Sequence, residues 1–399
     1  MKPSRRPVVA LLFAQAFALS GTRLSMIAIP WLVLNMTGNP MLTGLTAFAE
    51  MLPYVISKGL GGPLIDRLGA RFVAVVGEAT SVVAITLIPL IHFADVLHIH
   101  TLIPVVIGVG LLRGPTDAAK QALVPFVADT ATLPLERVTG LIGTVDRLAT
   151  TLGAGLAGAL VAFVGAAPAL IINAIAFCLA GLFVAFGIPR RSRHLADAGK
   201  SYLSDLREGW NFLTEDPVLV RIVVMIAVTN LLDQALISVM LPVWAREYGG
   251  GPGAIGLLVA VQSAFAVAGA ATAARFGDRM PRLKTYTIAF LIGGAPRFLI
   301  LLPVVPYDLM FVVLAGAGFA IGFINPIISA VGFERMPEPL VGRVSSLMAA
   351  LAWALIPFGG LFGGAAIALL GLPATVVVTA AAYFAVTMAP ILAPSFRKL

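Results

Sequence analysis

Runs of about 20 predominantly apolar residues recur along the whole chain, and each is long enough to cross the ~30 Å hydrocarbon layer of a membrane as a helix. Since no water reaches the backbone there, each run must close its own hydrogen bonds. Hydrophobic residues make up 59% of the 399 residues and charged residues only 12%. Soluble domains average about 25% charged residues, so an ordinary soluble fold is excluded. We predict an all-α membrane protein.

Proline and glycine mark most junctions between the apolar runs and delimit twelve predicted transmembrane helices. In the first half they cover 8–34, 41–61, 72–93, 101–126, 137–164 and 167–188. In the second half they cover 218–245, 254–276, 285–305, 309–333, 344–370 and 372–394. The predicted domains are therefore an N-terminal six-helix bundle (1–188), a linker (189–217) and a C-terminal six-helix bundle (218–399).

Basic residues gather in the connections on one side of the predicted membrane, including Arg5, Arg71 and Arg282, whereas Arg246 stands alone in the connections on the other side. Cytoplasmic connections are enriched in Lys and Arg, so both termini and the linker are expected to be cytoplasmic, in a multi-pass protein of the inner (plasma) membrane. This bias also explains the net charge of +8. We therefore expect membrane lipids, and not nucleic acid, as partners of these charges.

The linker contains a predicted amphipathic helix, in which Leu203, Leu206, Trp210 and Leu213 recur at helical spacing. Two interpretations remain open. The helix could lie on the inner membrane face with Trp210 among the headgroups, or it could pack as a covered helix on the bundle.

Internal repetition relates the two halves. The charged tract Gly62–Arg71 has a second copy at 274–282, with Asp66 and Asp278 placed 212 residues apart. Glu50 and Gln262 share that offset, and Gly108-Val109-Gly110 is echoed by Gly316-Ala317-Gly318. Repeats of this kind predict two pseudo-symmetric bundles with a substrate site at their interface, near the membrane midplane.

Two tracts of the sequence resemble those of a known family. The tract Gly62…Asp66-Arg67…Gly69…Arg71 resembles the signature loop between spans two and three of the major facilitator superfamily. The run Arg113-Gly114-Pro115-Thr116-Asp117-Ala118, followed by Gln121-Ala122-Leu123-Val124-Pro125, resembles the branch that includes macrolide-efflux and enterobactin-export proteins. The resemblance implies the major facilitator fold and proton-driven export of drugs and lipophilic metabolites. The antiporter motif of span five is only partly matched, because Gly153 to Ala159 keeps the glycines and lacks the proline.

The hinge tract is interpreted as a cytoplasmic latch. Gly62 and Gly69 would permit a tight turn or close helix approach. Asp66 would bind near the start of span eleven, at Gly342 to Ser345, and the arginines would hold carboxylates or lipid headgroups. The alternative is that these charges only stop translocation at the inner leaflet. The predicted hinge residues are Gly62, Asp66, Arg67, Gly69, Arg71, Asp278 and Arg279.

Ionisable residues inside the spans are costly unless they face water or a partner, and so they are candidates for function. Five fall in one predicted layer and form the candidate proton-coupling set, with Asp117 or Glu50 as the proton carrier: Glu50, Arg113, Asp117, Asp146 and Arg147. The alternative is a static ion-pair network. Lys120 and Lys58 are expected to extend toward the cytoplasmic surface.

Arg23 and Asp233 hold equivalent positions in spans one and seven and are interpreted as an outer gate pair across the halves, unless each faces water independently. The predicted substrate cavity is apolar and rich in amides, which suits a lipophilic, weakly polar molecule. Its candidate residues are Asn230, Gln234, Gln262, Phe265 and Asn325.

The most consistent function is secondary active, proton-coupled efflux of lipophilic drug-like or metabolite molecules by alternating access. Two alternatives stay open: a metabolite importer or uniporter, and a lipid flippase. No nucleophile–base or metal-ligand spacing predicts an enzyme, and no phosphate-binding motif predicts ATP use. We expect no cofactor and no metal, a monomer, and protons and a small lipophilic substrate as partners.

Overall fold

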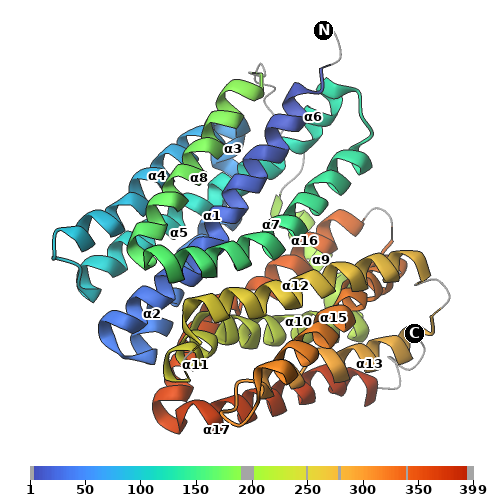
Figure 1. The fold of residues 1–399 in the computed structure, drawn as a ribbon. Coiled ribbons are helices and arrows are strands. Elements are labelled where there is room, and N and C mark those ends of the chain that lie inside the picture. Colours follow the sequence, from blue (N-terminus) through green and yellow to red (C-terminus); the bar gives the residue numbers. More distant parts are fainter. Residues whose placement is uncertain (1–3, 190–201, 249, 277–279, 338–339, 393–399) are drawn as a thin grey trace. The chain divides into compact units, whose positions relative to one another are not determined.

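The computed structural model describes residues 4–189, 202–248, 250–276, 280–337 and 340–392, which are helical almost throughout (Figure 1). The chain divides into two compact units. Unit 1 comprises Met1–Ala196 with Gly249–Ala260, and unit 2 comprises Asp197–Tyr248 with Val261–Leu399. Each unit is described by itself.

Unit 1 is a bundle of long helices. Its elements are α1 (Arg6–Thr37), α2 (Pro40–Leu60), α3 (Gly62–Leu68), α4 (Ala70–Phe93), α5 (Ile99–Ala122), α6 (Val124–Ala131), α7 (Leu135–Val164) and α8 (Ala166–Gly187). Helix α1 packs against α7 and α8, and α5 packs against α2 and α4. The predicted ends of these spans lie within a few residues of the observed ones, because Pro40, Gly69 and Gly165 sit at the junctions.

Unit 2 repeats the arrangement with more interruptions. Its elements are α9 (Tyr202–Glu215), α10 (Pro217–Ala235), the π-helix η1 (Leu236–Met240), α11 (Leu241–Glu247), α12 (Gly251–Phe276), α13 (Arg282–Gly293), α14 (Pro296–Leu299), α15 (Tyr307–Arg335), α16 (Val341–Trp353) and α17 (Ile356–Leu392). The first turns of α12 are grouped with unit 1.

Within the described residues, nine helices are long and apolar enough to cross a membrane. The predicted second span, α2, and the predicted ninth span, divided between α13 and α14, are not among them. One of the nine segments, Leu347–Ile391, holds most of spans eleven and twelve, because α17 passes through Gly371 at φ 76° and ψ 165°. The expectation of a helical membrane protein is confirmed, and the twelve predicted spans fit the helices.

Two spans expected to be continuous are broken. Span nine was predicted over 285–305, but α13 ends at Gly293 and α14 begins at Pro296. A flexible Gly293-Gly294 pair followed by a proline, which lacks an N–H donor and disfavours helix in the residue before it, explains the break. Span eleven is likewise interrupted between Trp353 and Ile356, just before Pro357.

The linker helix α9 packs on unit 2. Leu213 is buried in a cluster with Leu219, Val223 and Val344, while Trp210 is exposed. One face of the amphipathic helix is therefore covered by the bundle, as the second interpretation of the linker expects. The side chains of Leu203 and Leu206 lie outside the described part.

The internal repeat is visible as two matching helix contacts. A Cβ atom added to Gly110 on α5 would collide with the carbonyl oxygen of Glu50 on α2, and one added to Gly318 on α15 would collide with that of Gln262 on α12. One turn later, an added Cβ on Gly114 would lie 2.6 Å from the Tyr54 carbonyl oxygen.

The equivalent added Cβ on Gly322 would lie 2.7 Å from the Ala266 carbonyl oxygen. In both pairs of contacts the glycines of the two units are 208 residues apart in the sequence, and the residues that they meet are 212 apart. In both units the glycines let two backbones approach closely, as small residues do in membrane helix pairs.

Candidate functional site

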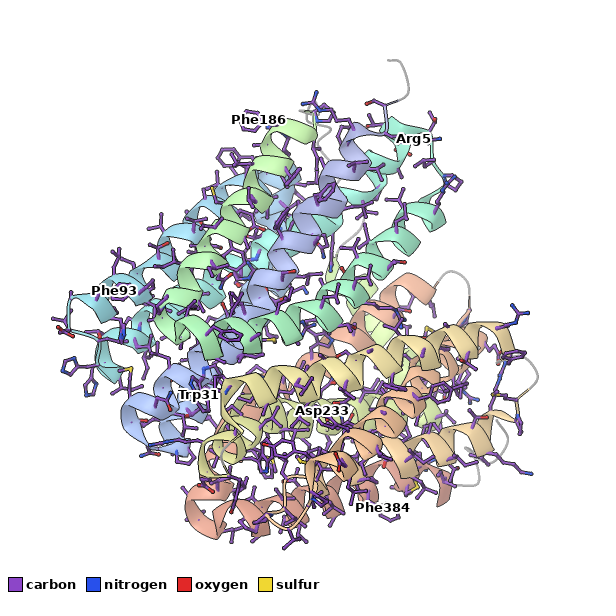
Figure 2. The ribbon with its side chains drawn as sticks, in the orientation of Figure 1. Arg5, Trp31, Phe93, Phe186, Asp233 and Phe384 are labelled. Carbon is purple, nitrogen blue, oxygen red and sulfur yellow. The ribbon has the colours of Figure 1, made fainter. Side chains whose placement is uncertain are left out.

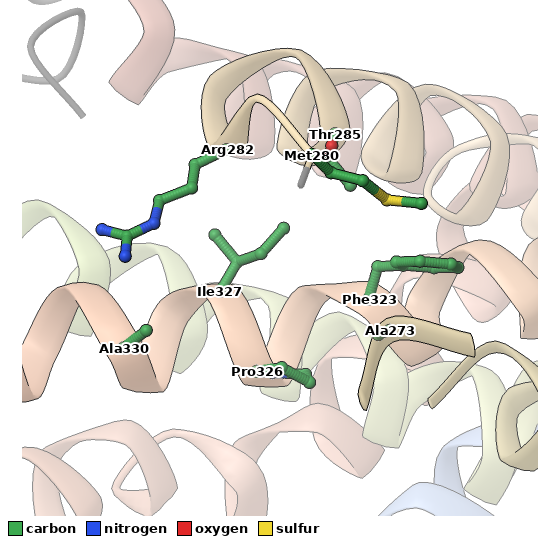
Figure 3. Close-up of a pocket in the computed structure, with 8 residues that line it drawn as sticks. All are labelled: Ala273, Met280, Arg282, Thr285, Phe323, Pro326, Ile327 and Ala330. Atoms are coloured by element: carbon green, nitrogen blue, oxygen red, sulfur yellow. The ribbon is translucent and has the colours of Figure 1, made fainter. Parts of the chain in front are cut away.

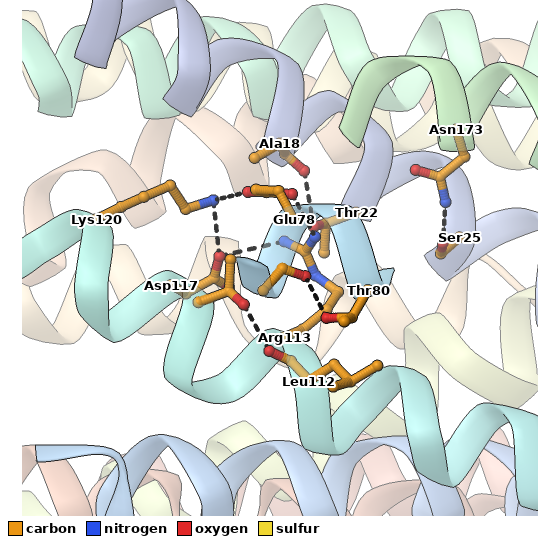
Figure 4. A network of polar contacts seen from close by, with 12 residues as sticks. Ala18, Thr22, Ser25, Glu78, Thr80, Leu112, Arg113, Asp117, Lys120 and Asn173 are labelled. Carbon is orange, nitrogen blue, oxygen red and sulfur yellow. Dashed lines mark hydrogen bonds and ion pairs between the residues drawn. The ribbon is translucent and has the colours of Figure 1, made fainter. Parts of the chain in front are cut away.

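A cluster of charged side chains between α4 and α5, here called the Arg113 network, consists of Glu78, Arg113, Asp117 and Lys120 (Figure 4). Helix α5 places Arg113, Asp117 and Lys120 on one face, because their spacings of four and three residues bring side chains together. The Asp117 carboxylate lies 3.2 Å from the Arg113 guanidinium and 3.0 Å from the Lys120 ammonium. Asp117 is therefore held between two cations.

Glu78 on α4 completes the Arg113 network from the neighbouring helix. Its carboxylate lies 2.7 Å from Lys120 Nζ and 4.0 Å from the Arg113 guanidinium. The Glu78 side chain is fully buried, and that of Lys120 is 2% exposed. The expectation that Lys120 extends toward the surface is therefore wrong: burying this ammonium is compensated by two carboxylates.

Two aromatic side chains, those of Phe177 and Tyr54, contact the Arg113 network. The Arg113 guanidinium lies 4.1 Å from the centre of the Phe177 ring, within cation–π range. The Tyr54 hydroxyl lies 3.2 Å from Asp117 Oδ2, and Lys58 Nζ lies 3.3 Å from the same hydroxyl. The cluster is thus tied to α2 through Tyr54.

Glu50, on the α2 face that meets Gly110, differs from Asp117. Its side chain is half-buried, and in the described part of the chain its carboxylate makes no ion pair and no hydrogen bond. The two carboxyls that sequence reasoning could not separate therefore have different surroundings. Asp117 is paired, and Glu50 is not.

The remaining members of the predicted layer are dispersed. Asp146 accepts a 3.4 Å hydrogen bond from Gln15 Nε2, and Arg147 is exposed on α7. Arg23 donates to the Thr150 hydroxyl at 3.0 Å. The structure brings Arg113 and Asp117 into direct contact and adds Glu78, Lys120 and Tyr54, which the predicted layer omitted.

Unit 2 contains its own buried ion pair (labelled at Asp233 in Figure 2). Asp233 on α10 bonds to the guanidinium of Arg297 on α14, which is 7% exposed and lies 4.7 Å from the centre of the Tyr383 ring. The π-helix η1 begins three residues after Asp233, and such segments are frequent at functional sites. Sequence reasoning had assigned Arg297 no role. A bridge between Arg23 and Asp233 stays a prediction. Forming it would compete with the contact of Arg23 with Thr150 and with that of Asp233 with Arg297.

The predicted cavity residues have mixed surroundings. Asn230 Nδ2 donates to the Ala352 carbonyl oxygen at 2.9 Å and so ties α10 to α16. Phe265 and Asn325 are exposed, while Gln234 and Gln262 are partly buried. The assignment of Gln234, Gln262, Phe265 and Asn325 to a substrate cavity stays a prediction, whereas Asn230 already satisfies a backbone group.

The first hinge tract is a short helix with a sharp end. Gly69 has φ 87°, a conformation that favours glycine, and it separates α3 from α4. Gly62 is the first residue of α3, and a Cβ atom added there would have no neighbour within 4 Å. Asp66 and Arg67 are exposed. Arg71 Nε donates to the Ile188 carbonyl oxygen at 2.7 Å, so this arginine caps the end of α8. Capping α8 was not among its expected roles.

The second hinge tract is only partly described, since Asp278 and Arg279 lie outside the described residues. Next to it, Arg282 and Glu334 form a bidentate pair at 2.6 Å between α13 and α15. A cavity of about 260 Å³ there is lined mainly by apolar side chains, including Met280, Phe323 and Ile327 (Figure 3). Among the described residues, no three His, Cys, Asp or Glu side chains are grouped to hold a metal ion.

Comparisons with known proteins find relatives that are similar in sequence and in fold. Two proteins named multidrug efflux pump Tap are similar to the chain. That of Mycolicibacterium fortuitum is 28% identical over 406 residues, covering 99% of this chain and 97% of its own. That of Mycobacterium bovis is 29% identical over 409 residues, covering 99% and 95%.

A crystal structure of the nucleoside transporter NupG matches 97% of this chain and 98% of its own, with a TM-score of 0.78 at 12% identity, and this likeness supports the fold alone. The sequence model of the Major Facilitator Superfamily matches residues 11–233 and 223–397, one match for each half. The expected fold class is therefore confirmed, and the chain belongs to the Major Facilitator Superfamily, a family of membrane transporters.

Proposed function

We propose that this chain exports lipophilic molecules across the membrane in exchange for protons, by alternating access. Three observations support export of such molecules. The family is one of transporters, two relatives matched over nearly their whole length are named multidrug efflux pumps, and the exposed side chains of unit 2 include the aromatic ring of Phe265 and the amide of Asn325.

The unpaired carboxyl of Glu50 carries the proposal of proton exchange. A charged carboxylate at membrane depth is costly without a partner, and binding a proton removes that cost. Asp117, by contrast, would lose two close cation contacts on protonation. We therefore assign proton binding to Glu50 and assign the Arg113 network a fixed electrostatic role beside it.

Release of the Glu50 proton would depend on how closely Glu50 approaches the Arg113 guanidinium. Arg113 and Lys120 together face Asp117 and Glu78, so their charges are nearly balanced. A substrate or helix movement that brings Glu50 nearer to Arg113 would favour its anionic form. This coupling links proton release to a conformational step.

For the hinge, we propose that exposed Asp66 binds near the start of α16 when the cytoplasmic side is closed. We also propose that the chain lies in the inner (plasma) membrane with both termini in the cytoplasm, because the basic connections gather on one side. The transporter acts as a monomer. Asp66→Asn should slow transport and shift the balance of inward and outward states. Wild-type rate with unchanged populations would reject the latch.

The test of proton exchange uses purified protein in vesicles loaded with ethidium, a lipophilic cation. An imposed proton gradient should accelerate ethidium movement through the wild-type protein. Glu50→Gln should abolish this acceleration, because an amide cannot bind the proton. Glu215→Gln is the matched control, since it makes the same chemical change at an exposed position outside the spans.

Two outcomes would contradict the proposal. If the gradient does not accelerate ethidium movement by the wild-type protein, proton exchange is wrong, and a uniporter or flippase explains the fold better. If Glu50→Gln responds to the gradient like wild type, Glu50 is not the proton-binding group.

A further inference from the structure

An open groove lies between the first turns of α1 and the last turns of α8, entirely within unit 1. It consists of two cavities of about 540 and 600 Å³, and both are lined by Arg6, Phe186 and Gly187. Figure 2 shows Arg5 and Phe186 at this same end of the unit. The groove therefore runs from the charged end of the helices down their apolar sides.

The lower part of the groove is apolar and open to the surroundings. Val9, Leu182 and Phe186 line it and are 47%, 45% and 74% exposed. Below them Phe13 stacks on Phe183, with ring centroids 5.2 Å apart. On helices that cross a membrane, such a surface meets acyl chains and not water.

The upper part of the groove is basic. Arg5 and Arg6 belong to its lining, and neither pairs with a carboxylate anywhere in the described residues. One N–H group of Arg6 donates to the Phe186 carbonyl oxygen at 3.1 Å, which fixes the guanidinium at the rim. A guanidinium has five N–H donors, so others stay available to an anion.

The Ser4 hydroxyl lies in the same upper cavity, whereas Thr130 there already donates its O–H to the Phe126 carbonyl oxygen and Arg71 donates to the end of α8. The Ser4 hydroxyl and the guanidinium donors of Arg5 and Arg6 suit a phosphate group, whose oxygens accept several hydrogen bonds. Charge at the top and an apolar channel below match the two parts of a phospholipid.

We propose that this groove binds an anionic phospholipid of the cytoplasmic leaflet, with its phosphate at Arg5 and Arg6 and an acyl chain along Val9, Leu182 and Phe186. Basic pockets between helices on the cytoplasmic side are where anionic headgroups bind. The inference rests on the orientation proposed above. It does not depend on the substrate or on proton exchange.

The test measures lipid binding to detergent-purified full-length protein by native mass spectrometry, with dioleoyl-phosphatidylglycerol or dioleoyl-phosphatidylcholine added. The wild-type protein should retain phosphatidylglycerol in preference to phosphatidylcholine. The double variant Arg5→Gln, Arg6→Gln should raise the apparent Kd for phosphatidylglycerol roughly twentyfold, and leave that for phosphatidylcholine unchanged. The matched control is Arg275→Gln with Lys284→Gln, which removes two exposed positive charges from unit 2.

A second arm separates a lipid from other occupants. Leu182→Trp fills the apolar channel without changing charge and should also weaken phosphatidylglycerol retention. Inorganic phosphate should not compete at concentrations well above those of the lipid, because it lacks the acyl chain. Thermal unfolding in detergent alone should be similar for all variants, which shows that each one folds.

Equal retention of the two lipids by wild type would overturn the proposal, as would unchanged retention in the Arg5, Arg6 variant. Competition by inorganic phosphate, or insensitivity to Leu182→Trp, would mean that the site binds phosphate without a lipid. No proton gradient or transported molecule is present, so either failure leaves the proposed function untouched.

Discussion

Glu78 shows how strongly one buried carboxylate can matter at the scale of a residue. It faces Lys120 and Arg113 with no exposure to solvent. Glu78→Gln leaves those two cations with Asp117 alone, and removing one partner of a buried pair costs about 3–5 kcal/mol. We expect a clear fall in the thermal unfolding midpoint in detergent.

Two further variants test that explanation. Glu334→Gln breaks the exposed pair with Arg282 and should change the midpoint much less, because solvent screens that pair. Combining Glu78→Leu with Lys120→Leu should restore part of the stability, since an apolar pair needs no compensation. A Glu78→Gln protein as stable as wild type would contradict the assigned network.

The carboxylate that begins α10 provides a prediction on pH. Asp216 accepts hydrogen bonds from Val218 N at 2.8 Å and from Arg335 Nε at 2.7 Å. Burial raises the pKa of Asp216, but Arg335 and the backbone N–H groups outweigh burial and lower the pKa. A folded-state pKa below the unfolded value means that the stabilisation is complete at neutral pH and is lost as the pH falls through the folded-state pKa.

Asp216→Asn keeps a helix-capping oxygen and loses the ion pair, so it should cost less than about 1 kcal/mol at pH 7. Asp216→Ala loses both and should cost about 1 kcal/mol more. The difference between wild type and Asp216→Asn should shrink as the pH falls below the ordinary aspartate range near about 3.9. The measurement is the thermal unfolding midpoint of both proteins across pH. A difference between wild type and Asp216→Asn that persists in acid would contradict the assigned ion pair.

At the scale of the helix, two glycines on α5 should respond oppositely to the same substitution. Gly110→Ala places a methyl group against the Glu50 carbonyl oxygen, whereas Gly108→Ala meets open space. Overpacking costs about 1–3 kcal/mol, and replacing an unobstructed helical glycine by alanine stabilises by up to about 1 kcal/mol. Gly110→Ala should therefore lower the unfolding midpoint, and Gly108→Ala should not.

The same contrast should appear in the second unit, between Gly318→Ala and Gly316→Ala. Gly318 meets the Gln262 backbone, while the nearest atom to an added Cβ on Gly316 is 3.6 Å away. If the two substitutions on either helix change the unfolding midpoint equally, the repeated glycines do not determine how closely the helices approach.

Much of the fold could be predicted at this scale, because apolar length and junction residues are local signals. The offsets that the sequence displays explain why the contact of Gly110 with Glu50 recurs as that of Gly318 with Gln262, although the contact itself is known only from the structure. The breaks within spans nine and eleven could have been recognised from Gly293-Gly294 and Pro357, which are also local.

The partners of the charged side chains could not be predicted in the same way. Glu78 lies 35 residues from Arg113, and Asp233 lies 64 from Arg297, so each pair depends on which helices become neighbours. One signal was present and could have been used. The spacing of Arg113, Asp117 and Lys120 places all three on one helix face, and so it predicts that Lys120 pairs with Asp117 and does not extend to the surface.

At the scale of the molecule, we propose that a proton on Glu50 controls the rearrangement of two related units. This control does not depend on which substrate is carried. The chain divides into the two units, and the contrast between paired Asp117 and unpaired Glu50 supports Glu50 as the proposed proton-binding group.

The most direct test is a pair of distance distributions measured by electron–electron double resonance in lipid nanodiscs, in a Cys178→Ala background. Spin labels at Thr132 and Lys284 report on the cytoplasmic side, and labels at His98 and Val304 report on the outer side. We expect a change of pH to shift the two distances in opposite directions, and Glu50→Gln to hold both at their low-pH values at every pH. Distances that ignore pH, or that respond to pH equally in Glu50→Gln and wild type, would contradict the proposed control.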